Sequence, residues 1–481
     1  MSGKYIGYCK IAVSIIYTLL VGNVSGQNTP DSLSVYLELA AKNNPTVMQN
    51  YYEYQAALQK VTQVGSLPDP ELNIGYFLKP MELMNGLQIA DIKLMQMFPW
   101  KGTLKESKDE MTLMAKAKYE SFLDAKSTVF YNIQSTWFEL YGYEKEIQIT
   151  TKNISILQMI ERLAIVKYKS SGSGISTGSV SGNSEEMNTA SSSAGNSSGM
   201  QSMSGGVTST STTASQSMQS SAMGSATSGL GLADLFKIKI AIMDLQNDSA
   251  LLQSQKITLM AKFNSYLNRP EQTAVYLPDS LQLTVLRMPI EAVLDSIKAN
   301  SPMLGMLNYE MKSLESRKKM VTKMGYPMIG IGLNYTIIGK SEMSTSDMNG
   351  KDMIMPMVSV TLPIYRKKYN AMITESELLN KAKEQEYVAT ENTLQTEYYK
   401  AVQLYLDASR RMKLYASQYQ LSSKSLELFI SSFTSSGSEL NDVLVAQQQM
   451  LDYQYKQEEA RVDYNTAIAF LNQLMAIFKT Q

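Results

Sequence analysis

Prolines are absent from two long stretches of this sequence. None occurs between Trp100 and Arg269, and none follows Pro363, although the 481-residue chain has 13 prolines. Because proline inside a helix costs about 3 kcal/mol, such stretches permit very long helices. A helix from Gly102 to Tyr168 would be about 100 Å long at 1.5 Å per residue, a length that suits a bundle or a tube. Apolar residues in it recur in steps of four and seven, as in a coiled coil: Leu104, Met111, Ala115, Phe122, Val129, Ile133, Leu140, Ile147 and Ile154.

The same plan of residues occurs twice along the chain. Segments of similar sequence lie at matching places in the two halves, which indicates an internal duplication. The matching segments are 42–45 and 299–302, 97–101 and 361–365, 170–172 and 435–437, 229–234 and 437–442, and 263–264 and 471–472. Each half therefore predicts a helix, two short strands, a very long helix, a glycine turn and a returning helix.

The expected strands are segments in which apolar residues alternate with polar or small ones. They cover about 71–79, 88–98, 328–338 and 353–362. Each is about 9–11 residues long, the length of a tilted membrane strand, and aromatic residues such as Trp100 and Tyr326 stand near the ends. A soluble sheet packed on helices remains an equally good interpretation of these strands alone.

Four strands cannot close a barrel, and open sheet edges are not tolerated in lipid. If these strands enter a membrane, several copies of the chain must supply them. Three copies would give twelve strands.

The N-terminus predicts a secretory signal. Lys4 and Lys10 precede an apolar run from Ile11 to Gly22, and Val24-Ser25-Gly26 predicts cleavage before Gln27. As a membrane anchor, this run is too short to cross ~30 Å of hydrocarbon. After residue 26 no run of 18 apolar residues follows, so no transmembrane helix is expected.

Several short motifs make the chain resemble the TolC family of outer-membrane efflux proteins. They are Asn43-Asn44-Pro45, Leu67-Pro68-Asp69-Pro70-Glu71-Leu72, Phe98-Pro99-Trp100, Leu362-Pro363-Ile364-Tyr365 and the stretch from Gly437 to Ala446. The resemblance covers the whole chain after the signal and rests on the order and duplication of the motifs. It implies a mainly α-helical protomer with a small membrane β-barrel. It also implies a homotrimer in outer-membrane lipid, with a twelve-stranded barrel and a periplasmic helical tube. A periplasmic adaptor and an inner-membrane pump would be the partners, and no cofactor is implied.

These expectations divide the chain into three parts. Residues 1–26 are the signal peptide, 27–269 the first repeat and 270–481 the second. The long helices are expected at about 102–168 and 365–434, and the returning helices at about 232–268 and 442–478. A turn at about 435–441 joins the second pair.

The glycine turns would form the periplasmic entrance and contact the adaptor. The residues expected there are Gly172, Gly229, Asp234, Gly437, Glu439 and Asp442. In the family this turn often carries an arginine after the glycine, and here Glu439 follows Gly437 instead, which puts the adaptor contact in doubt. Repeated by threefold symmetry, Asp442 could form an acidic ring that attracts cations. The alternative is a carboxylate stabilised by the helix dipole at a helix N-terminus.

Residues 173–229 form an insert in the first repeat, rich in serine, threonine, glycine and alanine, which cannot bury a core. It contains five methionines: Met187, Met200, Met203, Met218 and Met223. Thioethers are soft ligands that suit Cu(I) and Ag(I), and the chain has no histidine and only Cys9, within the signal. We therefore consider two roles for the insert, metal collection at the channel entrance or a passive spacer. Most of the other 27 methionines fall within helical or strand patterns, where methionine can fill a core.

Other function classes fit the sequence less well. There is no histidine, nucleophile motif, phosphate loop or paired carboxylate, so an enzyme is not expected. The 44 basic and 44 acidic residues balance, which argues against a nucleic-acid partner. A structural or adhesive trimeric coiled-coil surface protein and a Met-rich periplasmic metal-binding protein remain as alternatives. The first would not need paired strands, and the second would not need ~100 Å helical hairpins.

Overall fold

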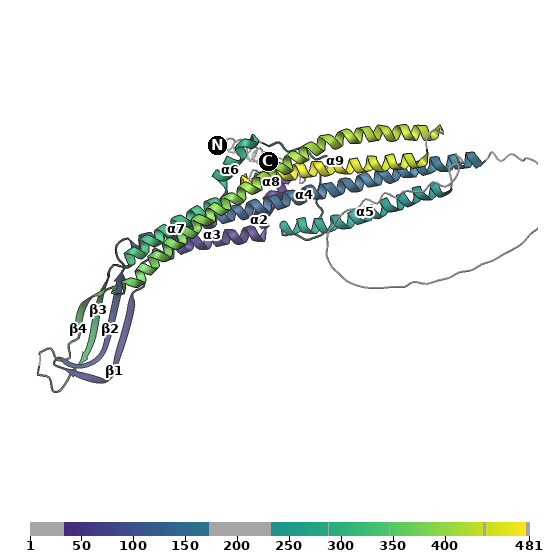
Figure 1. Cartoon of the computed structure of the whole chain (residues 1–481). Helices are drawn as coiled ribbons and strands as arrows, with labels where there is room; N and C mark the ends of the chain where they lie inside the picture. Colours follow the sequence, from purple (N-terminus) through teal and green to yellow (C-terminus); the bar gives the residue numbers. More distant parts are fainter. Residues whose placement is uncertain (1–32, 173–231, 287, 346, 436–438, 478–481) are drawn as a thin grey trace, which may run out of the picture.

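The computed structural model describes residues 33–172, 232–286, 288–345, 347–435 and 439–477. The expected signal peptide and the insert at 173–229 lie outside these residues. The described part of the chain is mainly helical with one small antiparallel sheet, which confirms the prediction of a mainly α-helical protomer with a few strands (Figure 1). The elements are α2 (Leu33–Asn43), α3 (Pro45–Val64), β1 (Glu71–Leu83), β2 (Gly86–Phe98), α4 (Thr103–Gly172), α5 (Leu232–Tyr266), α6 (Ile290–Asn300), α7 (Pro302–Met324), β3 (Met328–Gly339), β4 (Met353–Thr361), α8 (Arg366–Thr434) and α9 (Leu440–Leu474).

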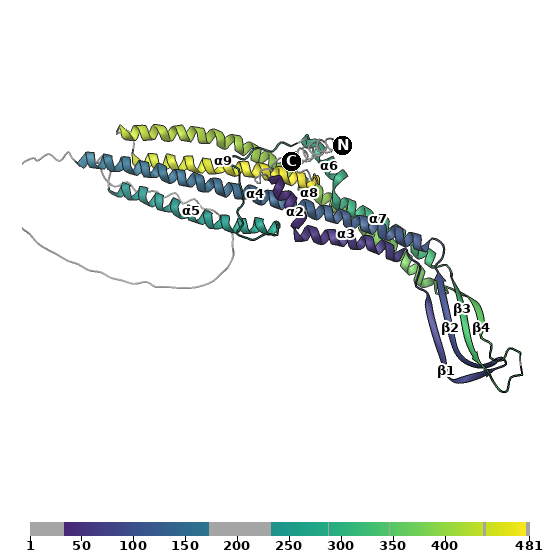
Figure 2. The same cartoon turned by 180° about the vertical axis from the view of Figure 1, so that it is seen from behind.

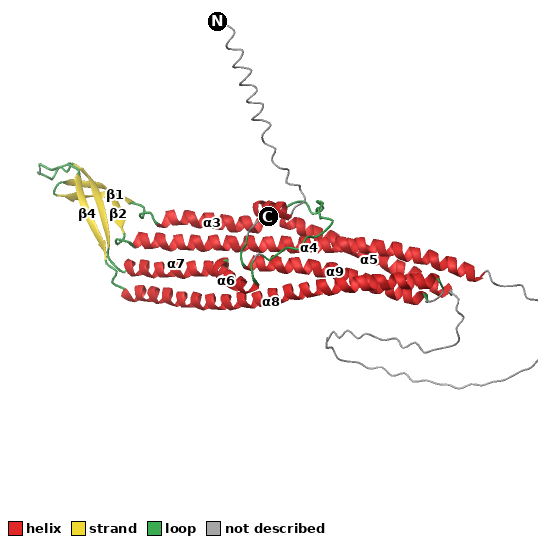
Figure 3. Cartoon of the chain, turned by 90° about the horizontal axis from the view of Figure 1, so that it is seen from above, coloured by secondary structure: helices red, strands yellow, loops and turns green. Residues whose placement is uncertain are grey.

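Two long helices give the molecule its rod shape. Helices α4 and α8 contain 70 and 69 residues and are therefore about 105 Å long at 1.5 Å per residue. Helix α4 continues to Gly172, four residues beyond the expected end, because nothing between Tyr168 and Ser171 breaks a helix. Figure 3 shows the sheet at one end of the bundle and the tips of the long helices at the other.

The shorter helices line up along the long ones. Helix α3 packs on α4 near the sheet, and α5 packs on α4 toward the tip. Helix α7 lies between α4 and α8 near the sheet (Figure 3). Helix α9 lies between α4 and α8 toward the tip (Figure 2). Near the sheet, the order of helices across the bundle is α3, α4, α7 and α8. Toward the tip, the order is α5, α4, α9 and α8. The two open sides of the bundle are thus formed by α3 with α5, and by α8.

Helices α3 and α7 begin in the same way. Each has proline as its first residue, where the missing N–H costs nothing. The side chain of Asn44 accepts hydrogen bonds from the amides of Thr46 and Val47, and Ser301 caps α7 through the amide of Leu304. These caps end α2 and α6 and start a new helix at once.

The hydrophobic core is divided along the rod. A central cluster joins α2, α4, the end of α5 and α9, where Tyr36 meets Phe263 edge-on with 5.1 Å between ring centroids. A second cluster lies toward the tip, around Leu157, Ile238 and Val443. A third joins α6, α7, α8 and the end of α9.

The sheet has the strand order β1-β2-β3-β4, and each neighbouring pair is antiparallel. Strand β1 contains Pro80 and ends at Leu83, beyond the expected end at about residue 79, and the register shifts between Tyr76 and Met81. Proline is tolerated there because β1 is an edge strand with an irregularity at that point. Pro356 likewise lies in the other edge strand, β4.

Candidate functional site: the sheet and the helix tips

One face of the sheet is apolar and exposed. The register places Ile74 opposite Ile92 and Ile331 opposite Val358. Ile74 is 68% exposed and Val358 is 74% exposed. The exposed apolar side chains of this face are Leu72, Ile74, Tyr76, Leu94, Phe98, Ile329, Ile331, Leu333, Ile354, Val358 and Val360. A contiguous surface of this kind marks a contact with lipid or with protein.

The opposite face carries polar side chains, glycines and methionines. Its cross-strand neighbours include Asn73 with Lys93, and Asp91 with Thr336. The remaining members are Gly75, Met95, Met97, Gly330, Gly332, Asn334, Met355, Met357 and Ser359. Such a face suits contact with water, so the two sides of the sheet have different surroundings.

A compact junction joins the sheet to the helices. Trp100 stacks on Tyr326 with 5.2 Å between ring centroids and 20° between the ring planes. Gly102 has φ +91°, and a Cβ there would lie 2.8 Å from Nζ of Lys323. Lys323 in turn binds Oε1 of Glu106 at 2.7 Å, so the turn into α4 is fixed to the end of α7.

The tips of the two helical hairpins are joined by Lys167 near the end of α4. Its Nζ donates a hydrogen bond to the carbonyl oxygen of Phe433 at 2.6 Å and lies 4.2 Å from the centroid of the Phe433 ring. Phe433 belongs to α8, so this contact links the first hairpin to the second. Lys167 could not be predicted from the sequence, because a single lysine near a helix end has no distinctive motif.

The expected entrance residues are found at the tips only in part. Asp234 lies in the first turn of α5 and pairs with Lys237 at 3.0 Å. Glu439 precedes α9 without forming a side-chain cap, and Asp442 is exposed in the first turn of that helix. Gly172 is the last residue of α4, whereas Gly229 and Gly437 lie outside the described residues. Both aspartates therefore stand at helix N-termini, where the dipole favours a carboxylate.

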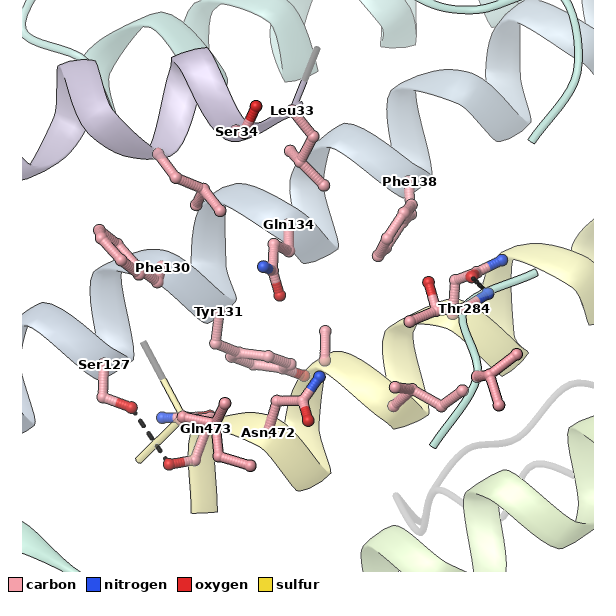
Figure 4. A pocket seen from close by; sticks show the side chains of 16 residues that line it. Leu33, Ser34, Ser127, Phe130, Tyr131, Gln134, Phe138, Thr284, Asn472 and Gln473 are labelled. Atoms are coloured by element: carbon pink, nitrogen blue, oxygen red, sulfur yellow. Dashed lines mark hydrogen bonds between the residues drawn. The ribbon is translucent and has the colours of Figure 1, made fainter. Parts of the chain in front are cut away.

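Mid-way along the rod, a pocket of about 140 Å³ opens between α2, α4, α9 and the segment around Thr284 (Figure 4). Ser127 donates a hydrogen bond to the carbonyl oxygen of Gln473 at 3.1 Å, and Asn465 accepts one from the amide of Thr284 at 2.9 Å. The side chains around the pocket are apolar or neutral and include Tyr131 and Gln134. The lining has no Asp, Glu, Lys or Arg side chain, and its Ser127 hydroxyl is bound to a backbone carbonyl.

Two acidic pairs lie along α4. Burial raises the pKa of the Asp124 carboxyl, and the charge of Glu397 raises it further. Burial likewise raises the pKa of Glu146, with a smaller contribution from Glu459. These carboxyls hold their protons more tightly than exposed ones, because the charged form is poorly solvated there.

Within the described ranges, no group of three or more histidine, cysteine, aspartate or glutamate residues could hold a metal ion. The five methionines of the insert, Met187, Met200, Met203, Met218 and Met223, lie outside those ranges. Among the helices that the structure describes, none is both long and apolar enough to cross a membrane.

Comparison with known proteins gives a match in structure and none in sequence. No protein-family model matches the chain. No curated protein matches it significantly either. The outer-membrane channel OprN superposes with a TM-score of 0.67 at 11% identity, covering 92% of this chain and 89% of that one. The outer membrane protein VceC of Vibrio cholerae gives 0.66 at 11% identity, covering 92% and 96%.

The outer membrane channel CmeC of Campylobacter jejuni gives a TM-score of 0.66 at 12% identity, covering 92% of this chain and 85% of that one. The shared features extend over nearly the whole length of each chain, from the sheet to the helical rod. The chain therefore has the fold of the TolC-family outer-membrane channels.

Proposed function

We propose that this chain is the protomer of a homotrimeric outer-membrane duct, through which an efflux system exports its substrates. The observation that carries the proposal is the exposed apolar face of a small sheet at the end of a helical rod about 105 Å long. A sheet with this face suits hydrocarbon, and a rod of this length suits a passage that leads away from the membrane. The likeness in fold to outer-membrane channels supports the same conclusion.

The open edges of the sheet favour a closed ring of several copies. Within the described residues, β1 and β4 each have a partner strand on one side only. Unpaired backbone groups are costly in lipid, so β1 of one copy would pair with β4 of the next. Three copies would supply the twelve strands of a barrel, with the polar face lining its interior.

The helical part offers two matching apolar stripes for the same ring. One stripe lies on α5 and consists of exposed Phe236, Ile240, Met243, Leu251 and Ile257. The other lies on α8 and consists of exposed Tyr399, Leu406, Leu414, Leu421 and Leu428. These helices form the two open sides of the bundle, on the same sides as β1 and β4 respectively. At each contact in the ring, the α5 stripe and β1 edge of one copy would meet the α8 stripe and β4 edge of the next.

In this arrangement the helices extend into the periplasm, and their tips form the entrance. Asp234, Glu439 and Asp442 would face a periplasmic adaptor, and an inner-membrane pump would supply the energy. Three copies of exposed Asp442 would create an acidic ring, which favours cations at the entrance. The expected repeat boundaries, 27–269 and 270–481, would then give each copy two equivalent hairpins around the duct.

Cysteine cross-linking tests the assembly, since Cys9 is the sole cysteine and lies in the expected signal. One cysteine replaces Asn73 on β1, and a second is moved along β4 from Met353 to Thr361. We expect at least one pair to yield a covalent, heat-modifiable trimer in the outer-membrane fraction. The matched control places the second cysteine at Asn334 on β3, which should give no intermolecular bond. A monomer in the soluble fraction, or equal cross-linking of the control, would refute the proposal.

We propose that the exported substrate is Cu(I) or Ag(I). The basis is the five methionines of the insert, which would lie near the entrance. The test is silver and copper tolerance of a deletion strain complemented with the full chain or with a chain lacking residues 173–229. Partial rescue by the shortened chain would support a role for the insert, and full rescue would make it a spacer. If deletion leaves metal tolerance intact but sensitises cells to dyes, a general efflux duct is the better conclusion.

A further inference from the structure

Two methionine sulfurs and a serine hydroxyl converge on one glycine at the polar face of the sheet. The hydroxyl of Ser359 on β4 donates to Sδ of Met95 at 3.3 Å and contacts Sδ of Met97 at 3.7 Å, both on β2. Between them lies Gly330 of β3, which pairs with Met97 on one side and Ser359 on the other. A Cβ at Gly330 would lie 2.6 Å from Sδ of Met97 and 3.1 Å from Sδ of Met95, so the two sulfurs lie close together.

The glycines of β3 create the space into which these side chains turn. A Cβ at Gly332 would lie 3.3 Å from Sδ of Met95. The register also places Met357 of β4 directly opposite Gly332. Met95, Gly332 and Met357 are therefore aligned across strands β2, β3 and β4, and the glycine between the two methionines has no side chain. Ser359 of β4 already contacts Met95 of β2 across β3, so side chains of these two strands can meet above the glycines.

We propose that Met95, Met97 and Met357, with the hydroxyl of Ser359, form a binding site for a soft monovalent cation of the Cu(I) or Ag(I) class. Thioethers prefer such ions, and several of them are needed because each is a weak ligand. The inference deepens the proposed function, and it rests on that function for the statement that this face lines the duct. It concerns residues of the sheet and is independent of the insert.

The charges around the site are compatible with a cation. Glu71 lies opposite Met95 in the register of β1 and β2, and Asp91 lies further along the same face of β2. Lys93 stands between Asp91 and Met95 on that face, so it is nearer to the sulfurs than Asp91 is and offsets Glu71. The nearby charges therefore do not exclude a monovalent cation, and the sulfurs would supply the affinity.

The competing explanation is packing alone. Methionine fills irregular gaps, and Met95, which is only 7% exposed, covers the surface of two glycines. Leucine has nearly the same volume and would fill the gap equally well without offering a sulfur. Methionine-to-leucine substitution therefore separates binding from packing.

The test uses the full-length chain in detergent micelles, labelled with carbon-13 at the methionine methyl groups and titrated with silver nitrate in chloride-free buffer. The resonances of Met95 and Met97 are identified by their loss in M95L and M97L. Met81 and Met84 near the β1–β2 turn, 60% and 91% exposed, serve as exposed reference thioethers outside the proposed site. We expect Met95 and Met97 to respond at a silver concentration at least about tenfold lower than Met81 and Met84, because joined ligands bind more tightly than single ones.

The variants make the result specific. M95L should abolish the early response of Met97, whereas the matched control M81L should leave it unchanged. Gly330→Ala should also abolish it, since the added methyl group would overlap Ser359 and Met97. If all four resonances respond together, or if M95L leaves Met97 unaffected, the site does not exist and the thioethers only pack.

The same samples separate this inference from the proposed function. Their molecular mass by light scattering reports whether the chain is trimeric. A trimer without early silver binding would overturn the site and keep the duct, whereas a monomer with early binding would keep the site and overturn the duct.

Discussion

Placing an arginine on each face of β4 tests whether the apolar face meets lipid. Val358 belongs to the apolar face and is 74% exposed, and Met355 of the same strand belongs to the polar face and is 44% exposed. In a soluble sheet both substitutions would change stability by no more than about 0.5 kcal/mol, because both side chains already face solvent. On the lipid face of a barrel, an arginine near the bilayer midplane costs roughly 2–4 kcal/mol per chain.

For Val358→Arg we therefore expect about 3 kcal/mol of destabilisation per chain, or more than about a hundredfold in the folding equilibrium. Met355→Arg should have a small effect, since water would fill the interior. The assay is urea-dependent folding of each variant into lipid vesicles, followed by the yield of heat-modifiable trimer in the outer-membrane fraction. Equal tolerance of the two arginines, or greater harm from Met355→Arg, would refute the orientation of the sheet and with it the barrel.

Three further substitutions test the helical part and the junction. Phe263→Ala should destabilise the chain by about 3–5 kcal/mol in chemical unfolding, because Phe263 is 0% exposed and packs edge-on against Tyr36; a cost below about 1 kcal/mol would contradict this. The raised pKa of Glu146 means that its contribution to the free energy of unfolding falls as pH rises above 4.5, its ordinary value. Glu146→Gln should therefore stabilise the chain at neutral pH but not at about pH 4, and a pH-independent difference would argue against burial as the cause. Gly102→Ala should lower the thermal midpoint and weaken the hold of Lys323 on the turn, since φ is +91° there; an unchanged midpoint would show that the turn relaxes freely.

The sequence predicts much of the fold because its strongest patterns are local. Missing prolines allow α4 and α8 to run for 70 and 69 residues, and the alternation around Ile331 distinguishes the two faces of the sheet. The alternation of apolar residues predicts an end of β1 near residue 79, whereas the strand continues through Pro80 to Leu83, because proline is tolerated in an edge strand.

Features that depend on pairing could not be read from the chain in advance. The stack of Trp100 on Tyr326 and the meeting of Met95, Met97 and Ser359 require the register of β2, β3 and β4. Met95 and Met97 are two residues apart in β2, which places them on one face, but period-two patterns do not say which strands become neighbours. The entrance is a prediction from glycines and acidic residues. Of these, Asp234 and Asp442 lie in the first turns of α5 and α9, at the tips of the hairpins.

The placement of both open edges on opposite sides of the protomer has a kinetic consequence for the proposed trimer. Joining two copies still leaves one exposed β1 edge and one exposed β4 edge, so a dimer is no better protected than a single chain. Adding a third copy brings the last two edges together within one particle, and this final step needs no further collision. It is therefore independent of protein concentration and loses no additional translational entropy. Open dimers should therefore be scarce at every concentration. Once the ring has closed, the chains should remain in the membrane as a trimer.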